Sequence, residues 1–361
     1  MSEAVVDDIV AVLPPLLQSL EALGFVGRHL NPPDFESVME AVGTPDEALS
    51  AVRPRLADWP VEFAGIKASL EAASDATLAA YQGLRAVQNG NGDLVSVFRA
   101  LRYAPRAQEA LYPLAAKLPP VSEFFLDPSL RDDTDLQARL AAPANENTGL
   151  LHDGNEPGSR GGFSLYVPEY YRPDRAWPLV MALHGGSGNG RGFLWSWLRD
   201  ARSRGAILVA PTATGNTSNK STWALMGDDT DTPNLARILD LVRSRWNIDS
   251  KRMLLTGMSD GGTFCYVTGF ESTSPFTHLA PVSATFHPLM AEMADAERLR
   301  GLPIHIVHGR LDWMFPVQVA RQTRDALSAV GANVTYRELE DLSHTYPREM
   351  NAPILEWLNG K

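Results

Sequence analysis

A serine surrounded by glycines lies between an apolar run and a helical segment. Residues 254–267 read LLTGMSDGGTFCYV, and Gly257, Ser259 and Gly261 within them fit the pattern Gly-x-Ser-x-Gly. Glycines two positions before and after a serine permit the close packing of a sharp strand-to-helix turn, which presents the hydroxyl near the positive end of the helix. A serine so placed is suited to nucleophilic attack. The alternative is a serine that caps a helix after an ordinary turn.

A glycine-rich loop follows an earlier apolar run, in the stretch MALHGGSGNG at residues 181–190. Acyl transfer needs backbone N–H groups aimed at a developing oxyanion, and glycines let the main chain approach the reacting group. We predict one donor at Gly186 and the other at the N–H of Asp260, with Ser187 as a substitute for Gly186. The competing interpretation, a phosphate-binding loop, lacks the following Lys-Ser or Lys-Thr. We expect His184 to be structural.

An acid and a histidine follow two later apolar runs. Asp312 comes four residues after His308 in IHIVHGRLDWMFP, and His344 lies in LEDLSHTYP, after the last predicted strand. A carboxylate in such a loop holds a histidine in its productive tautomer and stabilises the protonated ring. A solvated aspartate and a packed histidine are the alternatives. Among the eight histidines, His344 lies downstream of both Ser259 and Asp312 in the loop where a catalytic base is expected.

Aromatic residues accompany these segments. Trp223 and Trp313 fall in predicted loops and are candidates to line an acyl or aryl pocket. For Trp195 and Trp197, packing of helices onto the sheet is at least as good an interpretation.

The elements that must position these residues alternate along the second part of the chain. Seven short apolar runs between residues 163 and 340 are separated by amphipathic segments of helical length. Strands that alternate with helices imply right-handed crossovers and a mostly parallel sheet with helices on both faces. Functional residues of such a sheet collect beyond the carboxyl ends of the strands, which is where each candidate above falls.

The first part of the chain has a different pattern. Its apolar residues recur at helical spacing over residues 44–59, 61–87 and 93–118, with Thr44 as a predicted helix cap. A polar linker is predicted at about 142–162. We therefore predict a small helical domain over 1–145 and an α/β domain over 146–361.

Composition excludes several classes of function. The 361 residues are 44% apolar, and 43 acidic against 32 basic residues give a net charge of −11, which argues against a nucleic-acid surface and against docking to anionic lipid. A single cysteine, Cys265, permits no intrachain disulfide and no cysteine metal cluster. The N-terminal segment is acidic where a secretory signal is basic, and Pro14 and Pro15 interrupt its apolar run. We expect no membrane span and a cytoplasmic protein.

Residues 160–358 resemble the α/β-hydrolase superfamily, and more narrowly its carboxylesterase, feruloyl esterase and polyhydroxyalkanoate depolymerase-like serine esterases. The matching stretches are LYVPEYYRPDRAWPLVMALHGGSGNG, ILVAPTATG, NIDSKRMLLTGMSDGG, HIVHGRLDWMFPV and LSHTYP. The resemblance implies that Ser259 is the nucleophile, His344 the general base and then acid, and Asp312 its orienting carboxylate. Extracellular depolymerases commonly have a cysteine where this chain has Gly186, which weakens a polymer-degrading role more than ester chemistry.

The expected function is a serine carboxylic-ester hydrolase that forms an acyl-enzyme from a small-molecule ester, without cofactor or metal. The alternatives are a serine peptidase of the same fold and a binding protein whose hydrolase domain is vestigial. The helical N-terminal domain resembles no family that we can name, and its role as a lid, a homo-oligomer interface or a partner-binding module stays open.

Overall fold

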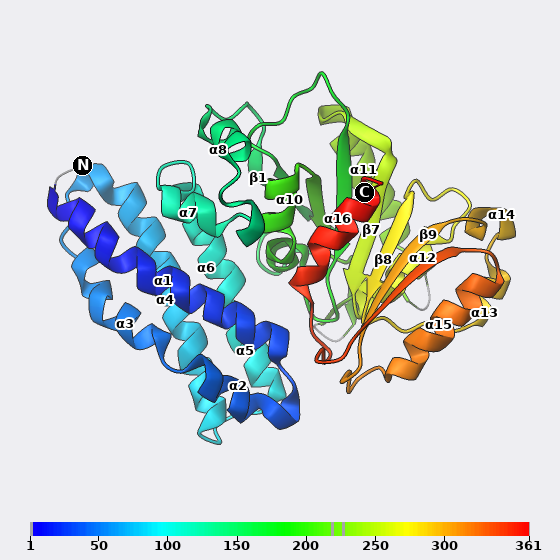
Figure 1. The fold of residues 1–361 in the computed structure, drawn as a ribbon, viewed down its shortest axis with the longest axis horizontal. Helices are drawn as coiled ribbons and strands as arrows, with labels where there is room; N and C mark the ends of the chain where they lie inside the picture. The colour runs from blue at the N-terminus through cyan, green and yellow to red at the C-terminus, as the bar shows by residue number, and fades with distance from the viewer. Residues whose placement is uncertain (1–2, 218–219, 226–227, 361) are drawn as a thin grey trace. The chain divides into compact units, whose positions relative to one another are not determined.

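The computed structural model describes residues 3–217, 220–225 and 228–360 (Figure 1). The chain forms two compact units, which divide between Asp133 and Thr134. This division lies before the predicted boundary at 145/146, because helix α8 (Thr134–Ala141) is part of the second unit. There the Arg139 guanidinium lies 4.8 Å from the centre of the Tyr170 ring.

All regular elements among the described residues of the first unit are helices, as the apolar spacing predicts. Pro45 is the first residue of its third helix, but the predicted cap Thr44 makes no side-chain hydrogen bond to that helix. Short 3-10 helices cover 32–34, 53–56, 61–63, 112–114 and 128–130. The α-helices are α1 (Glu3–His29), α2 (Phe35–Val42), α3 (Pro45–Val52), α4 (Ala64–Gln88), α5 (Leu94–Leu101), α6 (Tyr103–Leu111) and α7 (Pro119–Phe124).

The N-terminal segment forms the single helix α1. Pro14 and Pro15 interrupt the apolar run of the sequence but not this helix, whose stripe of apolar side chains from Val5 to Val26 is buried within the unit. An 18-residue window within α1 has a mean hydropathy of 1.7, and 44% of this window is buried. Among the described residues, α1 is the one helix that is long and apolar enough to cross a membrane. A buried core helix meets the same criterion, which is therefore weak evidence for a span.

The second unit is built on an eight-stranded sheet with the order β1-β2-β4-β3-β7-β8-β9-β10. Strands β3, β4 and β7 to β10 run parallel, and β2 is antiparallel to both of its neighbours. A separate hairpin pairs β5 (Gly215–Thr217) with β6 (Lys220–Thr222). The sheet strands are β1 (Gly149–Asp153), β2 (Phe163–Val167), β3 (Trp177–Leu183), β4 (Ile207–Pro211), β7 (Ile248–Met258), β8 (His278–Val282), β9 (Pro303–Gly309) and β10 (Asn333–Leu339).

Helices cover both faces of this sheet. In the strand order, the connection from β3 to β4 leads towards β1, whereas the later connections lead towards β10. Because such connections are right-handed, α10 lies on one face of the sheet and α11, α12 and α15 lie on the other. The C-terminal α16 packs beside α10 (Figure 1). The remaining helices of the unit are α9 (Gly190–Phe193), α10 (Leu198–Arg204), α11 (Asp231–Arg245), α12 (Asp260–Gly269), α13 (Leu289–Met293), α14 (Ala296–Leu299), α15 (Val317–Ala329) and α16 (Asn351–Leu358).

Strand register brings the candidate segments to one edge. Leu183 of β3 pairs with Gly257 of β7, and Val282 of β8 pairs with both Met258 and Val307. The loops that follow these strands therefore emerge side by side, as predicted for the carboxyl edge of a parallel sheet. One assignment was wrong: residues 149–153, predicted as part of the polar linker, form edge strand β1.

Candidate active site

The turn at Ser259 is as sharp as its glycines predict. Ser259 follows β7 and precedes α12 with φ +55° and ψ −121°, a conformation that is strained for a residue other than glycine. A Cβ on Gly257 would lie 2.6 Å from the backbone of Gly261, and one on Gly261 would lie 2.5 Å from the carbonyl oxygens of Leu183 and His184. Both positions therefore require glycine for the helix to begin this close to the sheet.

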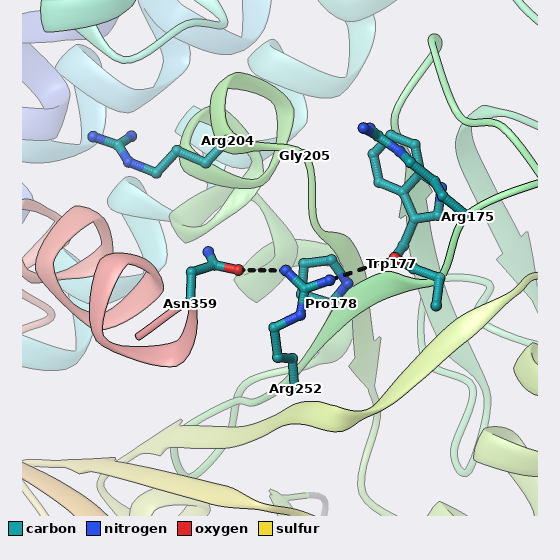
Figure 2. Close-up of a pocket in the computed structure, with 8 residues that line it drawn as sticks. Arg175, Trp177, Pro178, Arg204, Gly205, Arg252 and Asn359 are labelled. Carbon is teal, nitrogen blue, oxygen red and sulfur yellow. Dashed lines mark hydrogen bonds between the residues drawn. The ribbon is translucent and has the colours of Figure 1, made fainter. Parts of the chain in front are cut away.

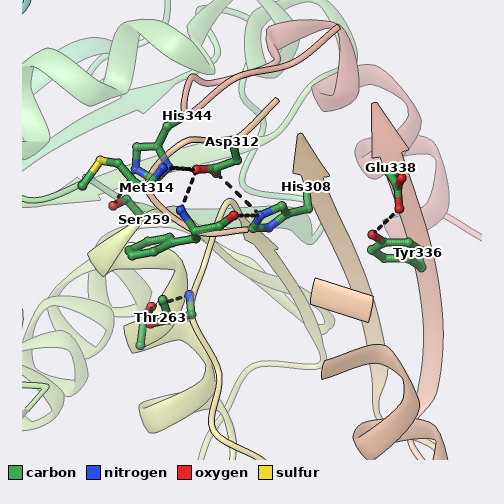
Figure 3. Close-up of polar contacts among 10 residues, drawn as sticks. Ser259, Thr263, His308, Asp312, Met314, Tyr336, Glu338 and His344 are labelled. Atoms are coloured by element: carbon green, nitrogen blue, oxygen red, sulfur yellow. Dashed lines mark hydrogen bonds and ion pairs between the residues drawn. The ribbon is translucent and has the colours of Figure 1, made fainter. Parts of the chain in front are cut away.

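The structure brings the three predicted catalytic side chains together (Figure 3). His344 Nε2 lies 3.0 Å from Ser259 Oγ. His344 Nδ1 lies 2.9 Å from Oδ2 and 3.1 Å from Oδ1 of Asp312. All three residues are buried, and they come from three different loops at the carboxyl edge of the sheet. The distances are those of a nucleophile, a base and an orienting carboxylate within hydrogen-bond reach of one another.

The Asp312 carboxylate is held ionised. Burial by itself raises its pKa, but the hydrogen bonds from His344 and from the N–H of Phe315 outweigh burial and hold the pKa below its ordinary value of 3.8. Oδ1 accepts hydrogen bonds from the N–H groups of Met314 at 3.0 Å and Phe315 at 2.8 Å. A fixed negative charge on the Nδ1 side of His344 stabilises the imidazolium that forms when Nε2 takes a proton.

A second histidine borders the same carboxylate. His308 Nε2 donates to the Phe315 carbonyl at 2.8 Å and lies 3.6 Å from Asp312 Oδ2, on the side away from His344 (Figure 3). Burial lowers the pKa of His308, so that this ring is neutral at pH 7. His308 thus fixes the loop that carries Asp312.

The glycine-rich loop lies against the nucleophile turn. Gly185 to Gly188 form a tight turn closed by a 3.0 Å backbone hydrogen bond, with Ser187 in the left-handed region at φ +60°. A Cβ on Gly185 would lie 3.5 Å from Ser259 Cβ, and one on Gly186 would lie 2.6 Å from Asp260 Oδ2. Gly186 is thereby beside Asp260, whose N–H is in the first helical turn, where helix geometry supplies no acceptor.

His184 is structural in this arrangement. Its Nδ1 donates to the Gly185 carbonyl at 2.7 Å, and its Nε2 accepts from the N–H of Ala213 at 3.1 Å. These partners fix the neutral tautomer, and complete burial lowers the pKa of His184 to about 4. The ring therefore supports the glycine-rich loop and carries no proton for catalysis.

The two predicted pocket tryptophans differ. Trp223 is buried, stacks on Phe264 with ring centres 5.3 Å apart, and donates to the His184 carbonyl at 2.7 Å. With 3% of its surface exposed, Trp223 supports the strand end that leads into the glycine-rich loop, and its pocket role stays a prediction. Trp313 is 44% exposed, and its ring centre lies 6.3 Å from that of His344. Trp195 and Trp197 are buried, in keeping with the packing interpretation.

Sequence reasoning did not identify the residues that hold the His344 loop. The Tyr346 hydroxyl donates to Asn351 Oδ1 at 2.8 Å, and Asn351 Nδ2 donates to the Ser196 carbonyl at 2.7 Å. The rings of Phe315 and His344 also pack edge to face, with centres 5.1 Å apart. The sequence does place Tyr346 and Phe315 within three residues of a predicted catalytic residue, which could have identified them as supporting residues.

A cavity of about 160 Å³ lies away from these residues, at the amino ends of β3 and β7 (Figure 2). The lining includes the guanidinium groups of Arg175, Arg204 and Arg252. They do not converge, because Arg175 stacks on Trp177 while Arg204 pairs with Asp200 and Arg252 with Asp249. The cavity is therefore no part of the candidate active site.

No group of histidine, cysteine and acidic side chains within the described part of the chain is arranged to hold a metal ion.

Comparisons with known proteins agree with the fold and with the class of chemistry. The family model described as phospholipase/carboxylesterase matches residues 227–360. A bifunctional acetylxylan esterase/xylanase of Neocallimastix patriciarum is 32% identical and aligns over 44% of this chain and 22% of that protein. A poly(3-hydroxybutyrate) depolymerase of Ralstonia pickettii is 31% identical over 37% of this chain and 31% of that protein. The chain thus spans under a third of the length of each of these relatives.

Among solved structures, a thermostable esterase is 24% identical, covers 58% of this chain and 62% of its own, and superimposes with a TM-score of 0.47. An acetyl xylan esterase from Aspergillus awamori is 15% identical over 59% of this chain and 100% of its own, with a TM-score of 0.47. The predicted α/β-hydrolase fold and the predicted resemblance to esterases are confirmed, and the matches support a carboxylesterase-type hydrolase.

Proposed function

We propose that the chain is a serine carboxylesterase that works through an acyl-enzyme, with Ser259 as nucleophile, His344 as base and acid, and Asp312 as the orienting carboxylate. The observation that carries the proposal is the continuous hydrogen-bonded path from Ser259 Oγ through His344 to Asp312, at 3.0 and 2.9 Å. It begins at a serine held in a strained turn, which is where α/β-hydrolases place a nucleophile.

The proton route follows from the partners of His344. Because Nδ1 donates to Asp312, Nε2 carries the lone pair and accepts the Ser259 proton as Oγ forms a bond to the ester carbonyl carbon. The imidazolium then donates that proton to the leaving alkoxide when the tetrahedral intermediate collapses to the acyl-enzyme. A water molecule then attacks the acyl-enzyme in the same way, with His344 taking its proton and passing it to Ser259 Oγ, which releases the acid and restores the serine.

The oxyanion of each tetrahedral intermediate is assigned to the N–H groups of Asp260 and Gly186. Support comes from the position of Asp260 in the first turn of α12 and from the contact of the glycine-rich loop with both Ser259 and Asp260. Ser187, in its positive-φ turn position, is the neighbouring candidate for the second donor. Donors fixed before the reaction lower the barrier without the cost of reorganisation.

The activities of the two relatives suggest where to begin with substrates. One acts on acetylated xylan and the other on a polymer of 3-hydroxybutyrate. We propose esters with short acyl groups as the first substrates to assay. The exposed Trp313 beside His344 is suited to contact the leaving alcohol, because His344 must reach that oxygen to protonate it.

The test is turnover of p-nitrophenyl acetate and butyrate by the chain and by Ser259→Ala. We expect the substitution to lower kcat by roughly 10⁴-fold or more, since the acyl-enzyme can no longer form. Thermal unfolding serves as the control for folding, and Ser203→Ala on α10 is a matched serine substitution elsewhere in the same unit. Hydrolysis by a folded Ser259→Ala at a rate near that of the unaltered chain would contradict the proposal.

A further inference from the structure

The side chain of Asp260 has a position that the mechanism does not use. Its backbone N–H is assigned to the oxyanion, but its carboxylate folds over Gly186, with Oδ2 2.6 Å from the point that a Cβ on Gly186 would occupy. The carboxylate therefore borders the site where the substrate carbonyl must lie. Burial raises the pKa of Asp260, and the charge of His344 partly offsets this rise.

This carboxylate has no partner of its own within residues 3–217, 220–225 and 228–360. Neither a hydrogen bond nor an ion pair joins the Asp260 side chain to another described residue, although Asp260 is half-buried. Most buried carboxylates are paired, because leaving a charge desolvated and unpaired is costly. An unpaired carboxylate at the mouth of a binding site is satisfied when a ligand supplies the partner.

A negative charge beside an oxyanion hole is also unfavourable for the reaction itself. As the carbonyl oxygen becomes negative, the Asp260 carboxylate repels it at short range in a partly desolvated site. A substrate that donates a hydrogen bond to Asp260 neutralises that repulsion, whereas a substrate with its own carboxylate increases it.

We infer that Asp260 is a specificity-determining residue, which selects esters with a hydroxyl or other hydrogen-bond donor near the scissile carbonyl and rejects esters that carry a carboxylate there. The inference rests on the proposed function, because it assigns Asp260 a place beside the reacting carbonyl. The hydroxyl or ammonium group of the substrate donates to Oδ1 or Oδ2 while the carbonyl oxygen is held by the backbone N–H groups.

The experiment compares three p-nitrophenyl esters with four-carbon acyl groups: butyrate, 3-hydroxybutyrate and hemisuccinate. The common leaving group confines differences in kcat/KM to the acyl part. The variants are Asp260→Asn, which removes the charge and keeps the shape, and Asp260→Ser, which removes the carboxylate altogether. Asp240→Asn on the exposed side of α11 makes the same change in net charge away from the site and is the matched control.

The unaltered chain is expected to hydrolyse the 3-hydroxybutyrate best and the hemisuccinate worst. In Asp260→Asn, the ratio of kcat/KM for hemisuccinate to that for butyrate is expected to rise by roughly tenfold or more, because a like-charge repulsion is removed. In Asp260→Ser, the preference for 3-hydroxybutyrate over butyrate is expected to fall by about tenfold, the loss typical of a hydrogen bond to a charged group. Asp240→Asn should leave both ratios unchanged.

Failure of the inference and failure of the proposed function give different results. If the unaltered chain hydrolyses these esters and Ser259→Ala does not, but both ratios stay within threefold in Asp260→Asn and Asp260→Ser, the inference is wrong and the proposed function stands. If Asp240→Asn shifts the ratios equally, the selectivity arises from net charge and the inference is also wrong. If Ser259→Ala retains activity, the proposed function itself fails. Should one Asp260 variant be too unstable to assay, the ratios in the other decide.

Discussion

Asp312 and Asp260 both interact electrostatically with His344, but their surroundings are opposite. Asp312 is buried and accepts hydrogen bonds from His344 and from two backbone N–H groups, so its pKa is lowered. Asp260 has no side-chain partner among the described residues, and burial raises its pKa. Neighbouring carboxylates whose pKa values are pushed apart have different roles. We interpret Asp312 as the permanent counter-charge of His344 and Asp260 as a carboxylate whose hydrogen-bond donor is supplied by the substrate.

Substitution of Asp312, the carboxylate with several hydrogen-bond partners, gives the largest expected effect. Asp312→Asn removes the charge that stabilises the His344 imidazolium and permits the wrong tautomer, so kcat should fall by roughly 10³- to 10⁴-fold. Steady-state hydrolysis of p-nitrophenyl butyrate measures this, with thermal unfolding as the folding control. A loss smaller than tenfold would show that Asp312 is not the partner that His344 requires.

Two glycines test how rigidly Asp260 is placed. A Cβ on Gly261 meets the carbonyl oxygens of Leu183 and His184 at 2.5 Å, which cannot yield without moving the nucleophile turn. Gly261→Ala should therefore lower kcat by roughly 100-fold or more, as expected for a displaced catalytic group.

Gly186→Ala is the contrasting substitution. Its Cβ meets the far end of the Asp260 side chain, which can rotate away, so kcat should change by less than about tenfold. Parallel kcat measurements on the two variants decide the point. Equal losses in both would contradict the distinction between a fixed backbone and a mobile carboxylate.

His305 is a more extreme case of burial without a partner. Both of its ring nitrogens are buried without a hydrogen-bond partner among the residues that the structure describes, and its ring packs on Trp357 with centres 5.4 Å apart. Burial, aided by the charge of Arg337, lowers its pKa to about 4. The unfolded chain takes up the proton at higher pH, so stability falls as pH falls from about 6.5 towards 4, by about 2 kcal/mol at pH 5.

Urea unfolding at pH 7 and pH 5 measures this contribution. His305→Leu should lose less free energy of unfolding between these two pH values than the unaltered chain does, because no buried ring remains to be protonated. His29→Leu, a partly exposed position at the end of α1 in the first unit, is the control. Identical pH dependence in the unaltered chain and in His305→Leu would contradict the prediction.

Tyr346 tests the loop on the other side of the base. Tyr346→Phe keeps the ring contacts with Phe193 and Trp197 but removes the hydrogen bond to Asn351. Loss of one buried hydrogen bond should lower kcat by roughly fivefold, through a less ordered His344, and leave KM unchanged. A change confined to KM would contradict this positioning role.

The smallest expected effect is on stability at Asp260. The pKa of Asp260 is raised in the folded chain, so its ionised side chain lowers the free energy of unfolding at pH 7. This destabilisation disappears once the pH is below the pKa that Asp260 has in the unfolded chain. Asp260→Asn should therefore raise the midpoint of thermal unfolding at pH 7 by about 1–2 °C. Asp312→Asn should lower it, since a depressed pKa contributes stability above the ordinary value of 3.8. The reverse order would contradict the comparison of the two carboxylates.

Much of this architecture is predictable from the sequence, because buried parallel strands have short apolar sequences bounded by turn residues. The seven strands from β2 to β10 that were expected in the sheet are present. Strand β1 was missed because GLLHD is a half-exposed edge strand without alternation. The continuous α1 was missed because packing of its apolar stripe outweighs the two prolines, an effect that local propensity does not contain.

The candidate site was predictable where backbone geometry dictates residue type, and less so where packing does. Gly257 and Gly261 are required by contacts of 2.6 and 2.5 Å, so the pattern around Ser259 is informative by itself. Trp223 and Trp313 looked alike in the sequence, yet one is buried under the glycine-rich loop and the other is exposed beside His344. Burial of a loop residue depends on its neighbours in space, which the spacing of residues does not reveal.

The most direct test of the proposed mechanism is to find which atom of the chain a fluorophosphonate modifies. We expect a single adduct on the peptide that contains Ser259, found by digestion and mass spectrometry. It should be absent in Ser259→Ala and should form roughly 100-fold more slowly or worse in His344→Ala, which lacks the base. An unaltered chain that hydrolyses esters but acquires its adduct at another residue, or acquires none, would contradict the assignment of Ser259 as the nucleophile.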